Sequence, residues 1–415
     1  MEYREQLKYI KSHQRDEYKT NNKRAGKKNN HVKRGKNSGQ SKKISGVNRV
    51  LFRTQVAATI FFLASMAILG IFPQAYMIAF VVILLLFLII VKAFQKRAQK
   101  SVKKRSSAKG FSLAVSILLI ILGFYGLKVN MALDKITVGE ENENHAVTSA
   151  FAVTDEPFNV YISGIDVYGD ITQESRSDVN LIATINPNTH KILLTTTPRD
   201  YYVTIPGVSG EQRDKLTHAG TYGVDTSMAT LENLYDTEIP FYVRVNFSSV
   251  EEIVDVMGGV NVESELSFTT GKAAGEIVDV KEGMNHFNGK QALAFVRERK
   301  ALATGDNQRG KNQQALLSAI IKKAVSPLIV FHANAMINSV SGNAETNLTE
   351  AQIKSLIRMQ ISRMKGWDIE SVAAEGDDSG KQYCYSYSAA PLYVTVPYES
   401  SVNEIREKIQ KMLEK

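Results

Sequence analysis

The residues with the clearest chemical potential are two aspartates that stand twelve positions apart, Asp166 and Asp178. Asp166 follows an apolar run that ends in a glycine turn, and Asp178 opens the next apolar run, two residues after Arg176. If these runs are neighbouring strands, both carboxylates meet at one end of a sheet. Two carboxylates suit Mg²⁺ when a substrate phosphate completes its coordination shell. The alternative is that Asp166 caps a turn while Asp178 pairs with Arg176.

Arg199 closes another apolar run, residues 191–197, in a Thr-Pro-Arg-Asp sequence. A residue at the carboxyl end of a strand lies where α/β sheets bind ligands. Taken alone, Arg199 would be interpreted as the partner of Asp200 in a surface ion pair.

A group of cations further along the chain strengthens the ligand interpretation. Arg297 and Arg299 fall within one predicted helical turn, and Arg309 and Gln313 share one face of the next predicted helix. The planar guanidinium group forms bidentate, charge-assisted bonds with phosphate. Each cation taken singly is explained by solvated helix surface, but the group gathers in a region whose average charge is negative. The sequence therefore predicts an anion site.

The sequence gives little indication of other kinds of catalytic or metal-binding site. The histidines lack metal-ligand spacing, and no nucleophile elbow, P-loop or dinucleotide fingerprint occurs. The single cysteine, Cys384, excludes an internal disulfide framework and a multi-cysteine zinc site. For Trp367 and the tyrosine-rich residues 383–387 we expect a core or edge-strand role.

Three apolar runs precede the chemical residues and indicate how they are held. Each run is about 17 residues long, at the short end of what crosses a bilayer core of about 30 Å, and none contains a charge or a polar stripe. We predict transmembrane helices within residues 51–128, at about 56–72, 75–91 and 111–127.

Charge sets the expected orientation of these spans. Residues 1–109 hold 24 Lys and Arg against 4 Asp and Glu, whereas the rest of the chain holds 27 against 38. The loop at residues 92–109 carries eight cations and no anion. Since cations stay on the cytoplasmic side, we expect a cytoplasmic amino terminus and a domain outside the cell membrane from residue 128 onward.

The amino-terminal tail, residues 1–50, is basic and poor in large apolar groups, so we predict disorder. Clustered cations also occur in nucleic-acid-binding segments. The preferred interpretation is the cytoplasmic flank of a membrane span, because the expected orientation places the tail beside the inner leaflet, whose anionic lipid attracts cations. The lack of a helix-turn-helix pattern also counts against direct DNA recognition.

Beyond a polar linker at residues 129–155, strands and helices alternate through a domain at residues 156–415. Strands are predicted at 158–163, 179–186, 191–197 and 241–245, and helices at 226–234, 248–257, 288–300, 307–324 and 349–364. The Asn-Pro-Asn turn after residue 185 predicts that the second and third strands form an antiparallel hairpin. This alternation is typical of an α/β domain with helices on both sheet faces.

The order and spacing of these motifs resemble the LytR–CpsA–Psr family of Gram-positive bacteria. The resemblance is carried by residues 163–166, 176–180, 197–200, 258–262, 295–299 and 309–313, and it is strong over about 158–324. The tail followed by membrane spans also fits the family, and three spans resemble its capsule-operon branch. Relatives in that branch often carry an extra domain, for which a linker of about 30 residues is too short.

The resemblance implies a three-layer α/β/α sandwich that binds a polyprenyl-pyrophosphate-linked glycan. The enzyme would transfer the glycan phosphate to a peptidoglycan hydroxyl, with capsular polysaccharide favoured over wall teichoic acid. It further implies that Asp166 and Asp178 hold Mg²⁺, and that the pyrophosphate is gripped by Arg176, Arg199, Arg297, Arg299, Arg309 and Gln313. Leu316, Leu317 and Ile320 could line a lipid groove, although we expect them to be ordinary core.

Two alternatives remain open from the sequence. One is a regulatory membrane protein of capsule or exopolysaccharide synthesis, in which the tail binds DNA or a cytoplasmic kinase and the outer domain only senses the lipid-linked glycan. Capsule-assembly proteins are expected partners of the transferase that the resemblance implies. The other is a pyrophosphatase that uses water in place of the glycan acceptor.

Overall fold

The structure is a computed structural model that describes residues 37–98, 102–136, 151–165, 175–302, 306–324 and 344–414. It divides into two compact units, one formed by Met1–Ala64 and Ile78–Phe124 and the other by Ser65–Met77 and Tyr125–Lys415. Each unit is considered by itself.

Three long helices occupy the amino-terminal part: α2 (Asn37–Leu69), α3 (Gln74–Ala98) and α4 (Val102–Ile136). Their apolar segments, Gly46–Leu69, Gln74–Arg97 and Ala108–Met131, are each 24 residues long and, by length and composition, suffice to cross a membrane. The helices exceed the predicted runs because they continue into polar flanks. The start of α2 therefore makes residues 37–50 of the predicted disordered tail helical, and α4 extends into the predicted linker; residues 1–36 of the tail lie outside the described residues.

A polar contact joins α2 to α4. Gln55 is fully buried, and its side-chain oxygen accepts hydrogen bonds from Ser112 Oγ at 3.2 Å and Ser116 Oγ at 3.1 Å. Hydrogen bonds of this kind between membrane helices contribute about 0.6–2 kcal/mol each. The contact therefore favours one register between the two helices.

The second unit is built on a six-stranded mixed sheet with the strand order β11-β6-β1-β2-β3-β12. Strands β1, β2 and β3 form an antiparallel meander, so the predicted hairpin is confirmed, and β6 and β12 add in parallel to β1 and β3. The bounds are β1 Phe158–Ile165, β2 Ser177–Asn186, β3 Lys191–Thr197, β6 Phe241–Asn246, β11 Ala344–Thr346 and β12 Asp368–Ala373.

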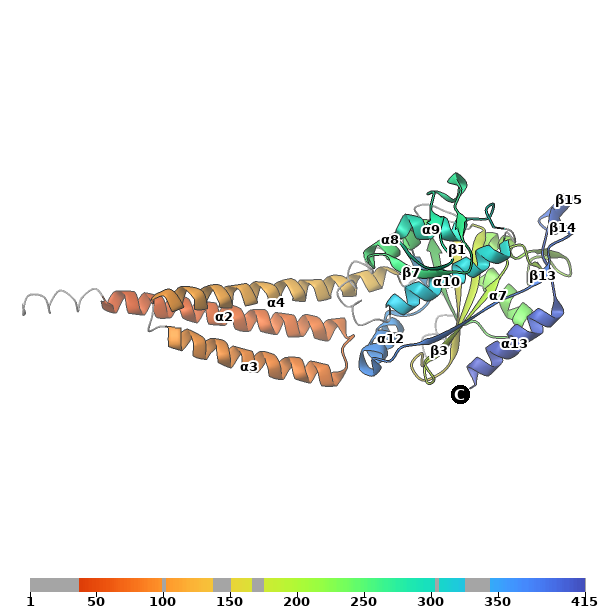
Figure 1. The fold of residues 1–415 in the computed structure, drawn as a ribbon. Coiled ribbons are helices and arrows are strands. Elements are labelled where there is room, and N and C mark those ends of the chain that lie inside the picture. The colour runs from red at the N-terminus through yellow and green to blue at the C-terminus, as the bar shows by residue number, and fades with distance from the viewer. Residues whose placement is uncertain are drawn as a thin grey trace, which may run out of the picture. The chain divides into compact units, whose positions relative to one another are not determined.

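Side chains alternate between the two faces of this sheet, as strand geometry requires. Ile182 and Leu193 pack on one face in the core that α7 and α13 cover, whereas Leu181 and Leu194 face α10. Figure 1 shows α7 and α13 on one side of the sheet and α10 and α12 on the other, which confirms the α/β/α sandwich. These helices are α7 Val224–Tyr235, α10 Asp306–Ala324, α12 Glu350–Arg363 and α13 Glu399–Leu413.

A second core forms where α8 and α9 pack with a small β-hairpin and with α10. Its elements are α8 Phe247–Val256, β7 Val260–Ser264, β8 Phe268–Thr269, η2 Lys272–Ala274, β9 Asp279–Val280, β10 Gly283–Phe287 and α9 Gly289–Arg297. Asn246 and Asn288 cap α8 and α9 in capping boxes, so α8 begins one residue before its predicted range.

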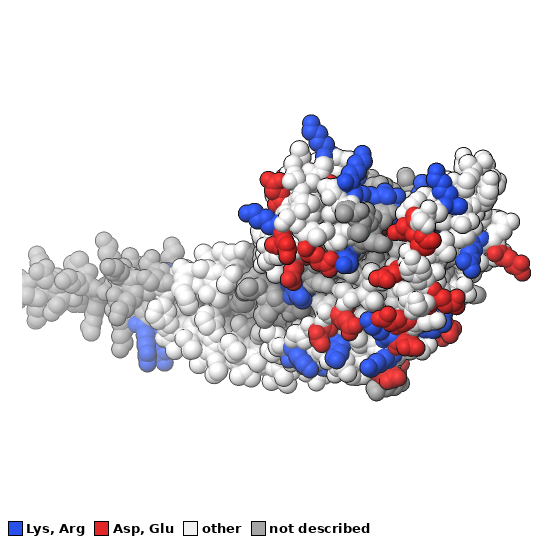
Figure 2. Space-filling model, turned by 45° about the vertical axis from the view of Figure 1, so that its right-hand side comes forward, with Lys and Arg blue, Asp and Glu red and all other residues white. Residues whose placement is uncertain are grey.

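The remaining elements lie at one end of the sheet and in a carboxyl-terminal ribbon. They are β4 Tyr202–Thr204, β5 Arg213–Lys215, α6 Leu216–Ala219, η1 Gly220–Tyr222, β13 Gly376–Asp377, β14 Lys381–Cys384, β15 Tyr387–Tyr393 and β16 Val396–Pro397. Of the core or edge-strand role expected for residues 383–387, the structure shows the second: Tyr383 and Tyr387 lie in the two-stranded sheet of β14 and β15. Tyr383, Tyr385 and Tyr387 are exposed, because this hairpin projects from the domain (Figure 1). On the face shown in Figure 2, acidic and basic side chains are interspersed over this domain.

Candidate active site

The site begins where β2 and β3 meet at one end of the sheet. Their register pairs Asn180 with Thr197, so the chain positions of Asp178 and Arg199 lie opposite each other just beyond the last pair. Arg199 Nη1 lies 2.6 Å from Asp178 Oδ1, and the two side chains are only 25% and 18% exposed. The partner of Asp178 is therefore Arg199, rather than Arg176 as in the alternative drawn from the sequence.

The acid that follows Arg199 fixes the turn that carries it. Asp200 is buried; its Oδ1 accepts a hydrogen bond from Lys215 Nζ at 2.8 Å, and its Oδ2 lies 3.5 Å from Arg199 Nε. The backbone oxygen of Asp200 accepts from Thr395 N at 2.8 Å. The ion pair with Asp200 thus exists, but it anchors Arg199 beside the pocket and does not lie free on the surface.

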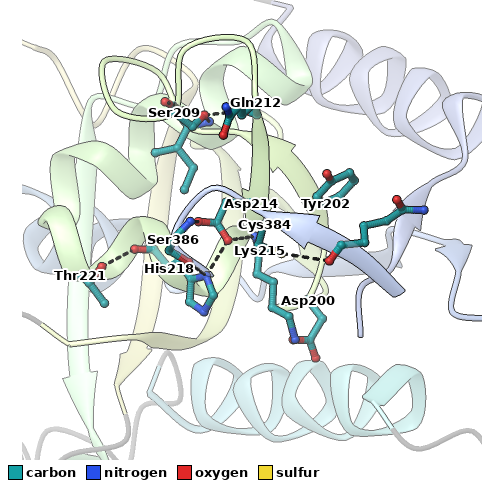
Figure 3. A network of polar contacts seen from close by, with 12 residues as sticks. Asp200, Tyr202, Ser209, Gln212, Asp214, Lys215, His218, Thr221, Cys384 and Ser386 are labelled. Carbon is teal, nitrogen blue, oxygen red and sulfur yellow. Dashed lines mark hydrogen bonds and ion pairs between the residues drawn. The ribbon is translucent and has the colours of Figure 1, made fainter. Parts of the chain in front are cut away.

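Lys215 belongs to a wider polar network that fastens the carboxyl-terminal ribbon (Figure 3). Buried Asp214 contacts His218 Nδ1 at 2.6 Å and accepts from Ser386 N at 2.8 Å. Burial alone would raise the pKa of Asp214, but the bonds from His218, Ser386 and backbone N–H groups lower it below the ordinary value. Ser386 Oγ also contacts His218 Nδ1, the atom that Asp214 contacts, so the three residues lack the two-sided histidine of a serine hydrolase triad.

Helix α10 supplies the opposite wall of the site. A Cβ on Gly310 would lie 3.4 Å from Thr196 Cγ2, which shows how closely the first turns of α10 cross the end of β3. A cavity of about 250 Å³ lies at this crossing. Its lining includes four residues predicted from the sequence: Asp178, Arg199, Arg309 and Gln313.

Three predicted phosphate ligands, Arg176, Arg297 and Arg299, are not among the lining residues of this cavity. Arg176 is exposed just before β2, and Arg297 ends α9. Asn312 Nδ2 donates to Phe295 O at 3.3 Å, which holds the end of α9 beside α10. Asp166 lies outside the described residues.

The arginines at the end of α9 do not share a helical turn as predicted, and Glu298 is the reason. Its backbone is extended, and its buried carboxylate accepts from the N–H groups of residues 299, 300 and 301 at 2.8, 2.7 and 3.0 Å, and from Gly271 N at 2.5 Å. Burial would raise the pKa of Glu298, but these four donors hold it below the ordinary value. Glu298 therefore shapes the loop that presents Arg299.

Two further cavities adjoin the pocket along α10. An apolar cavity of about 100 Å³ between the sheet and helices α8, α9 and α10 shares Gln313 with it. The structure places three predicted core residues of α10 in the core: Leu316, Leu317 and Ile320. The same side chains also line this apolar cavity, so a role in the core does not exclude a role in a groove. A polar cleft of about 1160 Å³ shares Lys311 and Ala373 with the pocket.

The sequence did not single out several lining residues, above all Glu375 and Tyr398. Glu375 follows β12, an edge strand that returns to β3 from far along the chain. The acid-glycine pair after an apolar run, Glu375 and Gly376, is the signal that could have found it, since it resembles the other strand ends of the site.

The donor set offers limited support for a metal. Among the residues that the structure describes, no group of three or more His, Cys, Asp and Glu side chains could hold a metal ion. Asp178 lines the pocket, but its Oδ1 is engaged by Arg199. A Mg²⁺ site at Asp166 and Asp178 stays a prediction.

Comparison with known proteins agrees with this architecture. A "Polyisoprenyl-teichoic acid--peptidoglycan teichoic acid transferase TagU" of Bacillus mycoides (strain KBAB4) is 30% identical over 281 residues, which cover 66% of this chain and 89% of that protein. The crystal structure of B. subtilis TagV matches with a TM-score of 0.52 and 25% identity over 62% of this chain and 98% of TagV. A structure of TagT bound to LIIa-WTA matches with a TM-score of 0.51 and 27% identity over 67% and 99%. The family described as LytR_cpsA_psr matches residues 124–397, about two thirds of the chain, and the protein belongs to this family.

Proposed function

We propose that this protein transfers a glycopolymer from a polyprenyl pyrophosphate carrier to peptidoglycan. The observation that carries the proposal is the junction at Gln313, where a pocket containing Arg199 and Arg309 meets an apolar cavity. A diphosphate attached to a long hydrocarbon requires such a pair of neighbouring sites. The relatives named as teichoic acid transferases support the same substrate class.

In this proposal Arg199, Arg309 and Gln313 bind the pyrophosphate, and Arg176, Arg297 and Arg299 complete its neutralisation. A pyrophosphate diester needs no external nucleotide, so catalysis consists mainly of positioning and of stabilising the charge on the transferred phosphoryl group. Asp166 and Asp178 would hold a Mg²⁺ ion, which supplies further neutralisation when bound. The base that deprotonates the acceptor is left unassigned.

Location follows from the charge pattern. In this proposal the three apolar helices anchor the protein in a membrane. The excess of cations in residues 1–109 supports a cytoplasmic amino terminus and an α/β domain outside. The enzyme then meets its lipid-linked donor within one leaflet, which raises the effective concentration of the donor. The three-helix anchor favours capsular polysaccharide as the polymer, and the relatives keep teichoic acid as the alternative.

The test uses the full chain in lipid vesicles that contain a labelled polyprenyl-pyrophosphate glycan, with peptidoglycan added as acceptor. Wild-type protein should attach label to peptidoglycan. Arg309→Ala should abolish attachment, and so should Arg297→Ala combined with Arg299→Ala. The matched control is Arg213→Ala, since Arg213 is exposed and is not among the pocket residues. Attachment that persists in both site variants would remove the pyrophosphate assignment.

Further arms of the assay separate the alternatives. Chelation should stop the transfer and Mg²⁺ should restore it; full activity in excess chelator would exclude the metal role of Asp166 and Asp178. Release of free glycan phosphate without attachment would indicate a pyrophosphatase. Deletion of residues 1–36, which leaves α2 intact, should preserve wall attachment in cells, whereas a regulator acting through its tail would lose function. Mass spectrometry of lipids that copurify with the full chain should detect polyprenyl phosphate or pyrophosphate.

A further inference from the structure

The most voluminous of the three cavities described above is the polar cleft beside α10, and the donor sites do not use it. Its volume of about 1160 Å³ exceeds the 300–1,000 Å³ typical of small-molecule pockets. Its walls come from β7, β10, α10 and β12, and it adjoins the pyrophosphate pocket, with which it shares the lining residues Lys311 and Ala373. A cleft of this size beside the reacting centre has room for part of a polymer.

The polar cleft and the apolar cavity lie on opposite faces of α10. Gln313, Leu317 and Ile320, spaced by three or four residues, face the apolar cavity. Ser318 and Lys322 share the same spacing but are turned by about half a helical revolution, and they face the polar cleft. The first turns of α10, which carry Arg309, lie between the two spaces at the pocket.

We propose that the polar cleft binds the acceptor peptidoglycan strand, an inference that rests on the proposed function. Phosphoryl transfer places the attacking and leaving oxygens roughly in line on opposite sides of the phosphorus. The leaving group is polyprenyl phosphate, whose tail occupies the apolar cavity on one side of α10. The acceptor hydroxyl must therefore approach from the other side, where the polar cleft meets the pocket.

The chemistry of the lining distinguishes the acceptor from the donor glycan. Carboxylates and ammonium groups both line the cleft, with carboxylates in the majority: Glu263, Glu265, Glu282, Lys311 and Lys322. The three carboxylates would repel the phosphate-rich chain of a teichoic acid donor, the alternative polymer named above. Peptidoglycan carries amide groups, hydroxyls, carboxylates and amino groups on its sugars and peptides, so it can pair with charges of both signs. Neutral hydrogen-bonding groups such as Asn261 and Ser371 complete the match.

One ion pair stands at the junction of the cleft and the pocket. Lys311 Nζ lies 2.9 Å from Glu265 Oε2, and the two side chains are 49% and 58% exposed. An exposed pair of this kind contributes little to stability. A charged acceptor can therefore displace it at small cost and bring its hydroxyl group toward the phosphate.

The experiment measures acceptor use and donor use separately with the full chain in lipid nanodiscs. Ser318→Trp places a bulky ring in the cleft, and Ser355→Trp is the matched control, a half-buried helical serine on α12. A second variant, Glu263→Lys with Glu282→Lys, changes only exposed charges, with Glu407→Lys on α13 as its control. The readouts are equilibrium binding of soluble uncrosslinked peptidoglycan strands, the KM for these strands in transfer, and binding of the lipid-linked donor.

We expect both cleft variants to weaken strand binding and raise the acceptor KM by about tenfold or more, while donor binding stays within about twofold of wild type. Unchanged strand binding in the charge variant, which should fold normally, would overturn the assignment. Weakened donor binding with an unchanged acceptor KM would assign the cleft to the donor glycan and would also overturn it. If wild-type protein binds strands in the cleft but transfers nothing, the proposed function fails while the strand site stands.

Discussion

Glu298 offers a sharp test of how the chain holds its arginines in place. Its buried carboxylate is the acceptor for four backbone N–H groups, three of them in the loop at residues 299–301. Glu298→Gln preserves size but turns one carboxylate oxygen into an NH₂ donor that must face another donor. With the amide oxygen toward the three loop donors, the bond to Gly271 is lost and the others lose their charge assistance.

The magnitude follows from these contacts. A hydrogen bond to a charged group contributes about 1.5–3 kcal/mol, so Glu298→Gln should destabilise the loop by about 2–3 kcal/mol. Hydrogen–deuterium exchange of the full chain should then show about 30- to 150-fold faster exchange at residues 299–301. Exposed Glu407→Gln should leave exchange unchanged. Equal exchange rates in Glu298→Gln and wild type would refute the role of the carboxylate.

The lowered pKa of Glu298 adds a pH dependence with a defined sign. A carboxyl group whose pKa is lower in the folded than in the unfolded protein stabilises the folded state. This stabilisation is fully present at a pH above the pKa of the unfolded state, near the ordinary value of 4.5, and it is lost as the pH falls through the lowered pKa of the folded state. The difference in loop exchange between Glu298→Gln and wild type should therefore be largest at neutral pH and should shrink in acid. A difference that grows in acid would contradict this account.

Three more predictions test the packing and the pocket. A Cβ on Gly289 would clash with the backbone oxygen of Glu251 in α8, so Gly289→Ala should lower the free energy of unfolding by about 1–3 kcal/mol. A Cβ on Gly366 would have no atom within 4 Å, so Gly366→Ala should change this free energy little. Denaturation of the full chain measures both effects. Burial raises the pKa of the Cys384 thiol to about 11. Because the thiolate is the reactive form, maleimide labelling at pH 8 should be about two orders of magnitude slower than for a free thiol. Rapid labelling of the folded protein would contradict this prediction. Asp178→Asn removes the charge that pairs with Arg199, so it should cost about 1.5–3 kcal/mol of stability. It should also lower the transfer rate by more than about tenfold, and an unchanged rate would exclude Asp178 from the site.

The sequence predicted the parts of the site that a single hairpin or a single helix builds. The β-branched runs and the Asn-Pro turn fix the β2–β3 hairpin, and its register alone brings Asp178 opposite Arg199. The spacing of Arg309 and Gln313 likewise places both on the wall formed by α10. These residues needed no knowledge of distant contacts.

The features of the site that the sequence did not predict depend on contacts between distant residues, which hydrophobic periodicity does not reveal. Glu298 ends α9 early because its carboxylate binds backbone groups beyond it, which a helical pattern does not reveal. Glu375 reaches the pocket because β12 joins β3 after a separation of about 170 residues. The tyrosine-rich residues 383–387 are as compatible with a buried strand as with an edge strand in composition. Their exposure depends on where the hairpin of β14 and β15 is attached to the domain, through Asp214 among others, which is a contact between distant parts of the chain.

The pocket wall draws on the chain from Asp178 to Tyr398, and this span has a consequence for biosynthesis. Chains emerge from the ribosome amino terminus first, so β1, β2 and β3 can pair while the later wall is still being made. A partially synthesised chain therefore has no complete binding cavity, and it cannot capture a donor before the last wall segment is in place. Substrate capture is in this way deferred until folding is nearly finished, and prematurely terminated chains that lack residue 398 would be inert.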